Sequence, residues 1–403
     1  MTFKERRGGI TAAKGFRACG VHSGVKKAKK DLALVLSTLS ANAAAVLTQN
    51  KVLAAPVLVT KEQLSRGHSV RALVVNSGNA NACTGERGMA DAWAMVRSTA
   101  SALGLKEEEV LVSSTGVIGQ FLPIELLTSA IRGSSSELSE SGGTDAAEAI
   151  MTTDTFIKEY AVELSLGGVP VTIGGMAKGS GMIAPNMATM LAFVTTDAAV
   201  SQDALRAAIR DGAERSFNRI SVDGDTSTND MLAIFANGAS GAPKIDAPAG
   251  KEYELFSGAL EQVLIALAKM IVRDGEGATK FVEIEVSGAA NEASAVKAAR
   301  AIASSNLVKT AINGEDANWG RILAAVGNAG IEFDPSEVEI CFGSVPILRR
   351  NYKINFSEEE AKKVLSQKEI RISVALNHGP GEARFWTCDL SKGYVDINAN
   401  YRT

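Results

Sequence analysis

The sequence has few of the side chains that usually bind metals or form disulfides. Its 403 residues include three histidines and four cysteines. The cysteines are Cys19, Cys83, Cys341 and Cys388. They lie far apart and form no CxxC pair, a pattern that favours free thiols in a reducing cytoplasm over a disulfide framework or a zinc site. We therefore expect no metal centre, and proton transfer has to be assigned to groups other than histidine.

The sequence also lacks a basic excess, a long apolar run and an apolar N-terminal segment. Its formal net charge of −3 argues against nucleic-acid binding, and the basic cluster between Lys4 and Lys30 indicates a solvated face. No uninterrupted apolar run reaches the roughly eighteen residues needed to cross a bilayer. The start, MTFKERRGG, has no apolar core of a secretory signal. We expect a cytoplasmic protein that binds neither nucleic acid nor a membrane.

The remaining sequence alternates between strand-like and helix-like segments. Apolar runs rich in Val, Ile and Leu predict strands at 32–39, 71–77, 108–115, 281–288 and 369–376. Helical periodicity predicts helices at 87–104, 123–132, 201–216, 252–272 and 293–304. Residues 158–175 predict a hairpin that turns at Gly167–Gly168, and 133–144 a surface loop. The length suits one large or two medium domains of α/β or α+β type, with helices layered on sheets.

Glycine is abundant, with 38 residues, and it gathers with small polar residues at the ends of these segments. The clusters lie at 75–85, 113–119, 174–182, 221–230, 273–281 and 313–322. Any one of them is explained by a tight connection, because glycine permits unusual backbone angles. Six together indicate a site built from loops on a rigid scaffold.

One cluster, GSGMIA at 179–184, fits the G-x-G-x-x-A pattern of dinucleotide-binding loops. That loop needs a helix to receive the pyrophosphate, whereas Pro185 and Asn186 interrupt a helix and a strand-like run follows. We interpret the segment as a tight turn. A non-catalytic nucleotide- or phosphate-binding module built on GGMAKGSG is one alternative function.

Thr189 stands at the start of the apolar run MLAFV and can be interpreted in two ways. A threonine there is explained by β-propensity alone. It is also a potential nucleophile if a base takes its proton, and an α-amine, with a pKa of about 7.7–8.0, is such a base. Attack by Thr189 on the Ala188 carbonyl, an N→O acyl shift and hydrolysis would release that amine at residue 189.

The segment GMAKGSGMIAPNMATML resembles the self-cleavage segment of the ornithine acetyltransferase family, also called glutamate N-acetyltransferases or arginine biosynthesis bifunctional proteins. The resemblance extends along essentially the whole chain. Its other motifs are GGITAAKGFRACGV, VNSGNANACTG, STGVIG, IMTTDT, SVDGDTSTND, RDGEGATK, DANWGR and INANYRT. Long motifs in a fixed order make this resemblance far more specific than the isolated glycine pattern.

The resemblance implies a role for each matched residue. Thr189 is the self-cleavage residue and the acetyl-transfer nucleophile, with Ala188 before the cut. Thr115 and Gly116 form the oxyanion hole. The implied substrate-binding residues are Thr189, Lys178, Glu276, Asn398, Thr403 and one of Thr152 and Thr153, with Thr152 preferred. A lysine and a glutamate suit an amino-acid substrate, which offers a carboxylate and an amine.

The resemblance also implies the reaction and the assembly. The acetyl group moves from N2-acetyl-L-ornithine to L-glutamate through an acetyl-threonine intermediate, with no cofactor. The implied fold is an N-terminal-nucleophile-like sandwich of sheets flanked by helices, cut into chains 1–188 and 189–403 that assemble two and two. Family members differ in whether they accept acetyl-CoA, and no residue here decides that. An N-terminal-nucleophile aminopeptidase or amidase, which delivers the acyl group to water, is the alternative enzyme.

Overall fold

The computed structural model describes residues 3–184 and 190–400 and divides into two compact units. Unit 1 comprises Met1–Gly179, Asn186–Asn218 and Asp225–Ile271. Unit 2 comprises Ser180–Pro185, Arg219–Gly224 and Val272–Thr403. The predicted cleavage site, Ala188–Thr189, and the predicted substrate-binding Thr403 lie outside the described residues.

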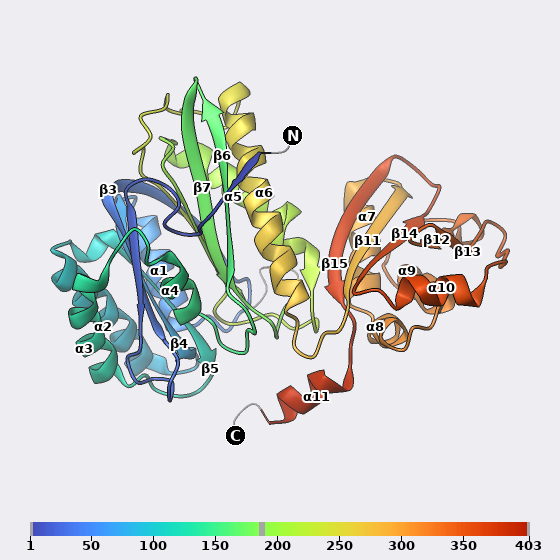
Figure 1. Cartoon of the computed structure of the whole chain (residues 1–403), viewed down its shortest axis with the longest axis horizontal. Coiled ribbons are helices and arrows are strands. Elements are labelled where there is room, and N and C mark those ends of the chain that lie inside the picture. The colour runs from blue at the N-terminus through green and yellow to red at the C-terminus, as the bar shows by residue number, and fades with distance from the viewer. Residues whose placement is uncertain (1–2, 185–189, 401–403) are drawn as a thin grey trace. The chain divides into compact units, whose positions relative to one another are not determined.

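Unit 1 is built on a nine-stranded mixed sheet (Figure 1). Its strands are β1 (Lys4–Arg6), β2 (Phe16–Val21), β3 (Leu32–Leu47), β4 (Val70–Asn79), β5 (Val110–Val117), β6 (Lys158–Leu166), β7 (Val169–Lys178), β8 (Leu191–Thr196) and β10 (Met231–Ala236). Eight of them follow the order β1-β6-β7-β8-β10-β3-β4-β5, and β2 pairs with β3. The long β3 joins the two halves, because its first part pairs with β2 and β4 and its last part with β10.

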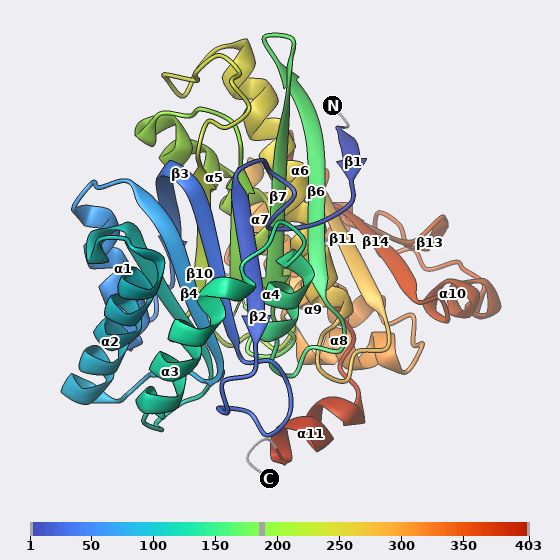
Figure 2. The same ribbon diagram turned by 60° about the vertical axis from the view of Figure 1, so that its left-hand side comes forward.

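Alternate residues of the strands enter different cores, as the two-residue period of a strand requires. Leu32 and Leu34 of β3 pack on one face, whereas Ala33 and Val35 pack on the other. The first face is covered by α1 (Ala55–Ser65), α2 (Gly85–Leu103) and α3 (Ile124–Ser134), which lie together beside β3, β4 and β5 (Figure 2). The short α4 (Gly143–Ala149) contributes alanines to the second core.

Two further helices of unit 1 are α5 (Gln202–Arg215) and α6 (Lys251–Arg273). The Ser201 hydroxyl caps α5 by accepting from the Ala204 N–H, as the sequence predicts. Among the described helices, α6 is the one long and apolar enough to cross a membrane, and half of its most apolar stretch is buried inside the protein. Leu264 of α6 lies against Gly212 and Leu267 against Gly175 of β7, so α6 packs as a core helix. No long apolar run marks α6 in the sequence, because charged residues such as Glu261 and Lys269 interrupt the helix.

Unit 2 is built on a six-stranded sheet in the order β13-β12-β14-β11-β15-β9. The strands are β9 (Ile220–Ser221), β11 (Phe281–Ala289), β12 (Glu339–Phe342), β13 (Val345–Leu348), β14 (Glu369–Ala375) and β15 (Gly381–Cys388). The helices are α7 (Glu292–Ala303), α8 (Asn306–Asn313), α9 (Trp319–Gly327), α10 (Glu358–Leu365) and α11 (Lys392–Ala399). Val282, Ile284 and Val286 of β11 enter the core, while Glu285 on the opposite face pairs with Arg384 at 3.0 Å.

The mixed α/β fold predicted from the sequence is confirmed, and the predicted helices and strands occur within a few residues of their expected bounds, except for the end of β3. The hairpin of β6 and β7 turns at Gly167 and Gly168, which have φ values of 57° and 83°. The predicted surface loop at 133–144 is only partly a loop: it contains the end of α3, a 3-10 turn at Ser135–Glu137, a β-bridge from Ser139 to Ala18 and the start of α4. Strand β3 continues to Leu47, eight residues past its predicted end, because tertiary pairing with β10 outweighs the helix propensity of ANAAAVL.

Candidate active site

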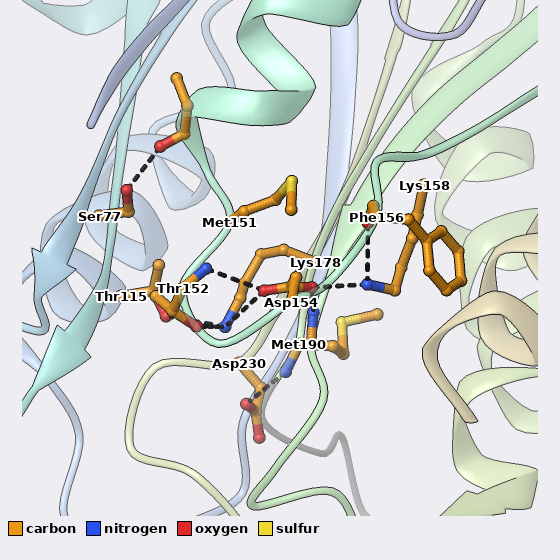
Figure 3. Close-up of polar contacts among 12 residues, drawn as sticks. Ser77, Thr115, Met151, Thr152, Asp154, Phe156, Lys158, Lys178, Met190 and Asp230 are labelled. Carbon is orange, nitrogen blue, oxygen red and sulfur yellow. Dashed lines mark hydrogen bonds and ion pairs between the residues drawn. The ribbon is translucent and has the colours of Figure 1, made fainter. Parts of the chain in front are cut away.

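The centre of the candidate site is Lys178, the buried last residue of β7 (Figure 3). Its Nζ donates to Thr152 Oγ1 at 2.7 Å and to Thr115 Oγ1 at 3.4 Å. Thr115 lies near the end of β5, and Thr152 follows α4. Three residues from separate glycine-rich or polar motifs therefore meet at one ammonium group.

Asp154, which is buried in unit 1, binds to several members of this cluster. Its carboxylate accepts from Lys158 Nζ at 2.7 Å, from the Gly179 N–H at 2.7 Å and from the Thr152 N–H at 2.9 Å. It lies 4.0 Å from Lys178 Nζ. Burial alone would raise the pKa of Asp154, but the ammonium groups of Lys178 and Lys158 and the Gly179 N–H more than offset it and hold that pKa well below its usual range.

The local sequence explains why this buried charge is tolerated. Asp154 lies in the irregular segment between α4 and β6, where its side chain accepts from the Thr152 N–H two residues before it. Lys158, the first residue of β6, is fully buried, and its Nζ lies 4.8 Å from the centre of the Phe156 ring. A buried carboxylate with two ammonium partners and two backbone donors has its hydrogen-bonding capacity filled.

Gly116 follows Thr115 at a point where two strands approach closely. In the parallel pair of β4 and β5, Gly116 lies opposite Gly78. Gly116 has φ 132°, and a Cβ there would lie 2.3 Å from the Gly78 carbonyl carbon and 2.5 Å from the Asn79 nitrogen. Both contacts are with backbone atoms, so only glycine fits at this position.

Strand β8 begins two residues after Thr189 and is held on both sides. It pairs antiparallel with β7 and parallel with β10, and all six of its residues are buried. Met190 is tied to the start of β10 twice: its N–H donates to Asp230 Oδ1 at 3.1 Å, and its carbonyl accepts from the Met231 N–H at 3.2 Å. Met190, the first described residue after Thr189, is therefore held in place by β10 and by Asp230, the residue before β10.

Besides Asp154, sequence reasoning missed two charged residues near this cluster. One is Asp230, which ends the glycine-containing cluster at 221–230, although no local pattern marked this residue as functional. The other is Lys26, which the basic-cluster interpretation placed on a solvated face; that interpretation is wrong for Lys26. Its half-buried ammonium donates to the Met151 carbonyl at 2.6 Å and to the Lys30 carbonyl at 3.0 Å. Burial lowers the pKa of Lys26 to about 8. The charge of Asp31 acts in the opposite direction and raises this pKa, whereas the charge of Lys178 lowers it further.

Unit 2 holds two other predicted residues together. Asn398 of α11 donates through Nδ2 to Glu276 Oε2 at 2.8 Å. Glu276 is buried, and its N–H donates to the Ser180 carbonyl at 2.9 Å. A Cβ on Gly181 would lie 2.3 Å from the Glu276 carboxylate, so this backbone approaches the acid closely.

The glycine-rich segment 179–184 already has an anionic partner within unit 2. The N–H groups of Met182 and Ile183 donate to the Asp223 carboxylate at 2.5 and 2.8 Å. These are the kinds of backbone donors that a phosphate would need. The tight-turn interpretation therefore describes this segment, and Asp223 occupies donors on which a phosphate-binding module would depend.

The structure thus brings Thr115, Gly116, Thr152 and Lys178 together in unit 1, and Glu276 with Asn398 in unit 2. Thr153 is half-buried beside Thr152; the choice between them as the substrate contact stays a prediction. Within residues 3–184 and 190–400, no three His, Cys, Asp or Glu side chains are grouped so as to hold a metal ion. The four cysteines are free thiols.

Comparison with known proteins gives matches along the whole chain. The model of the ArgJ family matches residues 17–403. The arginine biosynthesis bifunctional protein ArgJ of Symbiobacterium thermophilum is 54% identical over 399 residues, which are 98% of this chain and 99% of that protein. The protein of the same name from Bacillus subtilis is 48% identical over 398 residues, 98% and 97% of the two chains. A solved ornithine acetyltransferase from Mycobacterium tuberculosis, in complex with ornithine, is 43% identical with a TM-score of 0.43 and covers 46% of this chain and 98% of its own. The chain therefore belongs to the ArgJ family.

Proposed function

We propose that the protein is a self-processing glutamate N-acetyltransferase of arginine biosynthesis, in which Thr189 carries the acetyl group from N2-acetyl-L-ornithine to L-glutamate. Family membership supports the assignment to acetyl transfer in arginine biosynthesis. The observation that carries the proposed site is the meeting of Lys178, Thr115 and Thr152 in unit 1, beside the strand pair that fixes Met190.

The proposed cycle has two half-reactions. The Thr189 oxygen attacks the acetyl carbonyl of N-acetylornithine while the α-amine of residue 189 takes the hydroxyl proton. The tetrahedral intermediate collapses, the proton passes to the leaving nitrogen, and ornithine departs. Glutamate then enters, and its neutral α-amine attacks the ester carbonyl. The proton that this amine loses passes through the α-amine of residue 189 to the departing Thr189 oxygen, and N-acetylglutamate leaves. No cofactor takes part in this cycle.

The surrounding residues receive roles that fit their chemistry. The Thr115 hydroxyl and the Gly116 N–H would stabilise the oxyanion, a contribution of about 3–4 kcal/mol for one such donor in other enzymes. Lys178 and Thr152 would bind polar groups of the substrate, as a buried ammonium that already donates to two hydroxyls can. Glu276, Asn398 and Thr403 would bind the substrate amine and carboxylate groups. The carboxylate of Glu276 suits the ammonium of ornithine, because it can accept a charge-assisted hydrogen bond.

The proposal includes the processed form of the protein. Cleavage between Ala188 and Thr189 would give chains 1–188 and 189–403, and two copies of each would assemble in the cytoplasm. The cut would separate β7 from β8, which stay paired through backbone hydrogen bonds from Ile173↔Thr196 to Lys178↔Leu191. That ladder would hold the new chain start beside Lys178 after the bond is broken.

The proposal is tested by following both fates of the acetyl group. Purified protein is supplied with N-acetylornithine and glutamate, and N-acetylglutamate, ornithine and free acetate are measured together. We expect ornithine and N-acetylglutamate in equal amounts and little acetate. Acetate in place of N-acetylglutamate would instead show an amidase, and no turnover of N-acetylornithine would remove the assignment. A parallel assay with acetyl-CoA and glutamate tests whether acetyl-CoA serves as a donor.

Gly116→Ala is expected to disable the proposed oxyanion hole. Because the new Cβ would overlap the backbone of Gly78 and Asn79, β5 must shift, which we expect to cost about 2–4 kcal/mol in unfolding free energy. Displacement of the residue-116 N–H should also lower kcat roughly 100-fold or more. Denaturant unfolding and the acetyl-transfer assay measure the two effects.

Gly119→Ala is the matched control for this substitution. Gly119 has φ 80°, yet a Cβ there meets no atom within 4 Å, so the cost should be limited to about 1 kcal/mol of backbone strain with kcat unchanged. Equal effects of the two substitutions would contradict the role given to Gly116.

A further inference from the structure

Asp230 has a carboxylate oxygen that the structure leaves unused. The residue precedes β10 and is 1% exposed. Its Oδ1 accepts from the Met190 N–H at 3.1 Å, whereas its Oδ2 is buried and has no hydrogen-bond partner among the described residues. Leaving one buried polar atom unpaired costs about 1–3 kcal/mol, and more for a charged group. Such an atom indicates a partner that is present in another state of the protein.

The position of Asp230 identifies where that partner would come from. Asp230 and Met231 hold Met190 from both sides, through the Met190 N–H and carbonyl. Consecutive Cα atoms are about 3.8 Å apart across a trans peptide bond. Residue 189 is therefore one peptide unit from the atom that Asp230 already holds.

A positively charged partner would suit the surroundings of Asp230. Burial raises the pKa of its carboxyl well above the usual range, against the opposing effects of the Met190 N–H, Lys178 and Ser227. Lys178, on β7, is the positively charged residue among these groups. An additional cation next to Oδ2 would favour the ionised carboxylate and fill its empty hydrogen-bonding position.

Self-cleavage would supply such a cation. Before the cut, the nitrogen of residue 189 is a neutral amide; afterwards it is an α-amine that becomes an ammonium when it takes the Thr189 hydroxyl proton. We propose that Asp230 is a positioning residue of the mature enzyme: Oδ1 holds Met190 in register, and Oδ2 receives the α-amino group released at residue 189. This inference rests on the proposed function, because it requires the cut before Thr189.

The substitution Asp230→Asn separates the two tasks of this side chain. Asparagine keeps an oxygen for the Met190 N–H but carries no charge for the α-ammonium. Since an opposite charge at close range raises the pKa of an amine by about 1–3 units, and the amine must be neutral to take the hydroxyl proton, loss of Asp230 should move the acid limb of the kcat/KM profile to lower pH by at least about one unit. We also expect complete cleavage and a kcat roughly 10- to 100-fold lower.

Asp197→Asn is the matched control. Asp197 is also 1% exposed, directly follows β8, and accepts from the Lys14 and Thr172 N–H groups at 3.0 and 2.8 Å. It should lose stability without a shift of the acid limb. The kcat/KM profile for N-acetylornithine is measured for the wild type and both variants, with cleavage followed by intact-protein mass spectrometry.

Two results would overturn the inference. One is an acid limb that Asp230→Asn leaves in place, which would reduce Asp230 to a structural contact of β8. The other is an Asp230→Asn chain that stays uncut while Asp197→Asn is cut, because Asp230 would then serve the cleavage itself. If the wild type neither cleaves nor transfers acetyl groups, the proposed function fails instead, so the two failures are distinguishable.

Discussion

Replacing Thr189 with alanine is expected to leave the chain as a single polypeptide and to lower acetyl transfer at least about 1,000-fold. Alanine has no oxygen to attack the preceding carbonyl, so neither the cut nor the acetyl ester can form. Removal of a catalytic nucleophile typically costs several powers of ten in kcat. Denaturing electrophoresis and the N-acetylglutamate assay measure the two losses in the same preparation.

Thr189→Ser is the control for this prediction. Serine retains the hydroxyl, so we expect cleavage to proceed and acetyl transfer to remain measurable. Far-UV circular dichroism should show the same folded secondary structure in the two variants, which would show that the loss in Thr189→Ala comes from chemistry and not from misfolding. A Thr189→Ala protein that still separates into two fragments would contradict the proposed self-cleavage. Full activity in that protein would contradict the assignment of Thr189 as the nucleophile.

Asp154→Asn is expected to destabilise unit 1 by about 3–5 kcal/mol. The carboxylate is fully buried and lies between Lys158 Nζ at 2.7 Å and Lys178 Nζ at 4.0 Å. Neutralising it removes a buried carboxylate from beside two buried ammonium groups, which is among the costly single changes. Acetyl transfer should fall as well, because Lys178 loses the charge that helps to hold it against Thr115 and Thr152.

The pH dependence of this effect has a definite sign. Because the pKa of Asp154 is held below its ordinary value of 3.8, the folded protein keeps this carboxylate ionised at pH values where the unfolded chain protonates it. The stabilisation is therefore fully present above about pH 4–5 and is lost as the pH falls towards the folded-state pKa. The difference in unfolding free energy between wild type and Asp154→Asn should shrink as the pH drops below 4.

Asp246→Asn provides the comparison for Asp154. Asp246 also pairs with a lysine, Lys244, at 2.7 Å, but the two side chains are 73% and 57% exposed. Such surface pairs contribute about 0–1 kcal/mol. Urea unfolding at pH 7 measures both variants. A cost below about 1 kcal/mol for Asp154→Asn would contradict the buried network described here.

The parts of the fold that could be predicted from the sequence are those with strong local signals. The hairpin at Gly167–Gly168 needs glycine for its positive φ values, and FVEIEVSG alternates between a buried and a polar face. The second half of β3, with its run of alanines, has no strand signal of its own and is a strand because β10 pairs with it. Short elements such as α4 and α9 contain too few periods to be recognised before their neighbours are known.

The candidate site divides in the same way. The long motifs around Thr115, Thr152 and Lys178 predicted the residues that the structure brings to one ammonium group. Asp154, Lys26 and Asp230 were not predicted, because each matters through a contact that only the folded chain creates. For Lys26 that contact is with the carbonyl of Met151, 125 positions away in the sequence, and no local pattern encodes such a distance.

The central claim is that residue 189 carries the acetyl group between the two substrates. The most direct test is intact-protein mass spectrometry of the purified enzyme after incubation with N-acetylornithine and without glutamate. We expect two chains separated between Ala188 and Thr189, with the mass of one acetyl group added to the chain that starts at Thr189 and lost again when glutamate is supplied. An uncut chain, or a cut chain that turns over N-acetylornithine yet never gains the acetyl mass when glutamate is absent, would contradict the account.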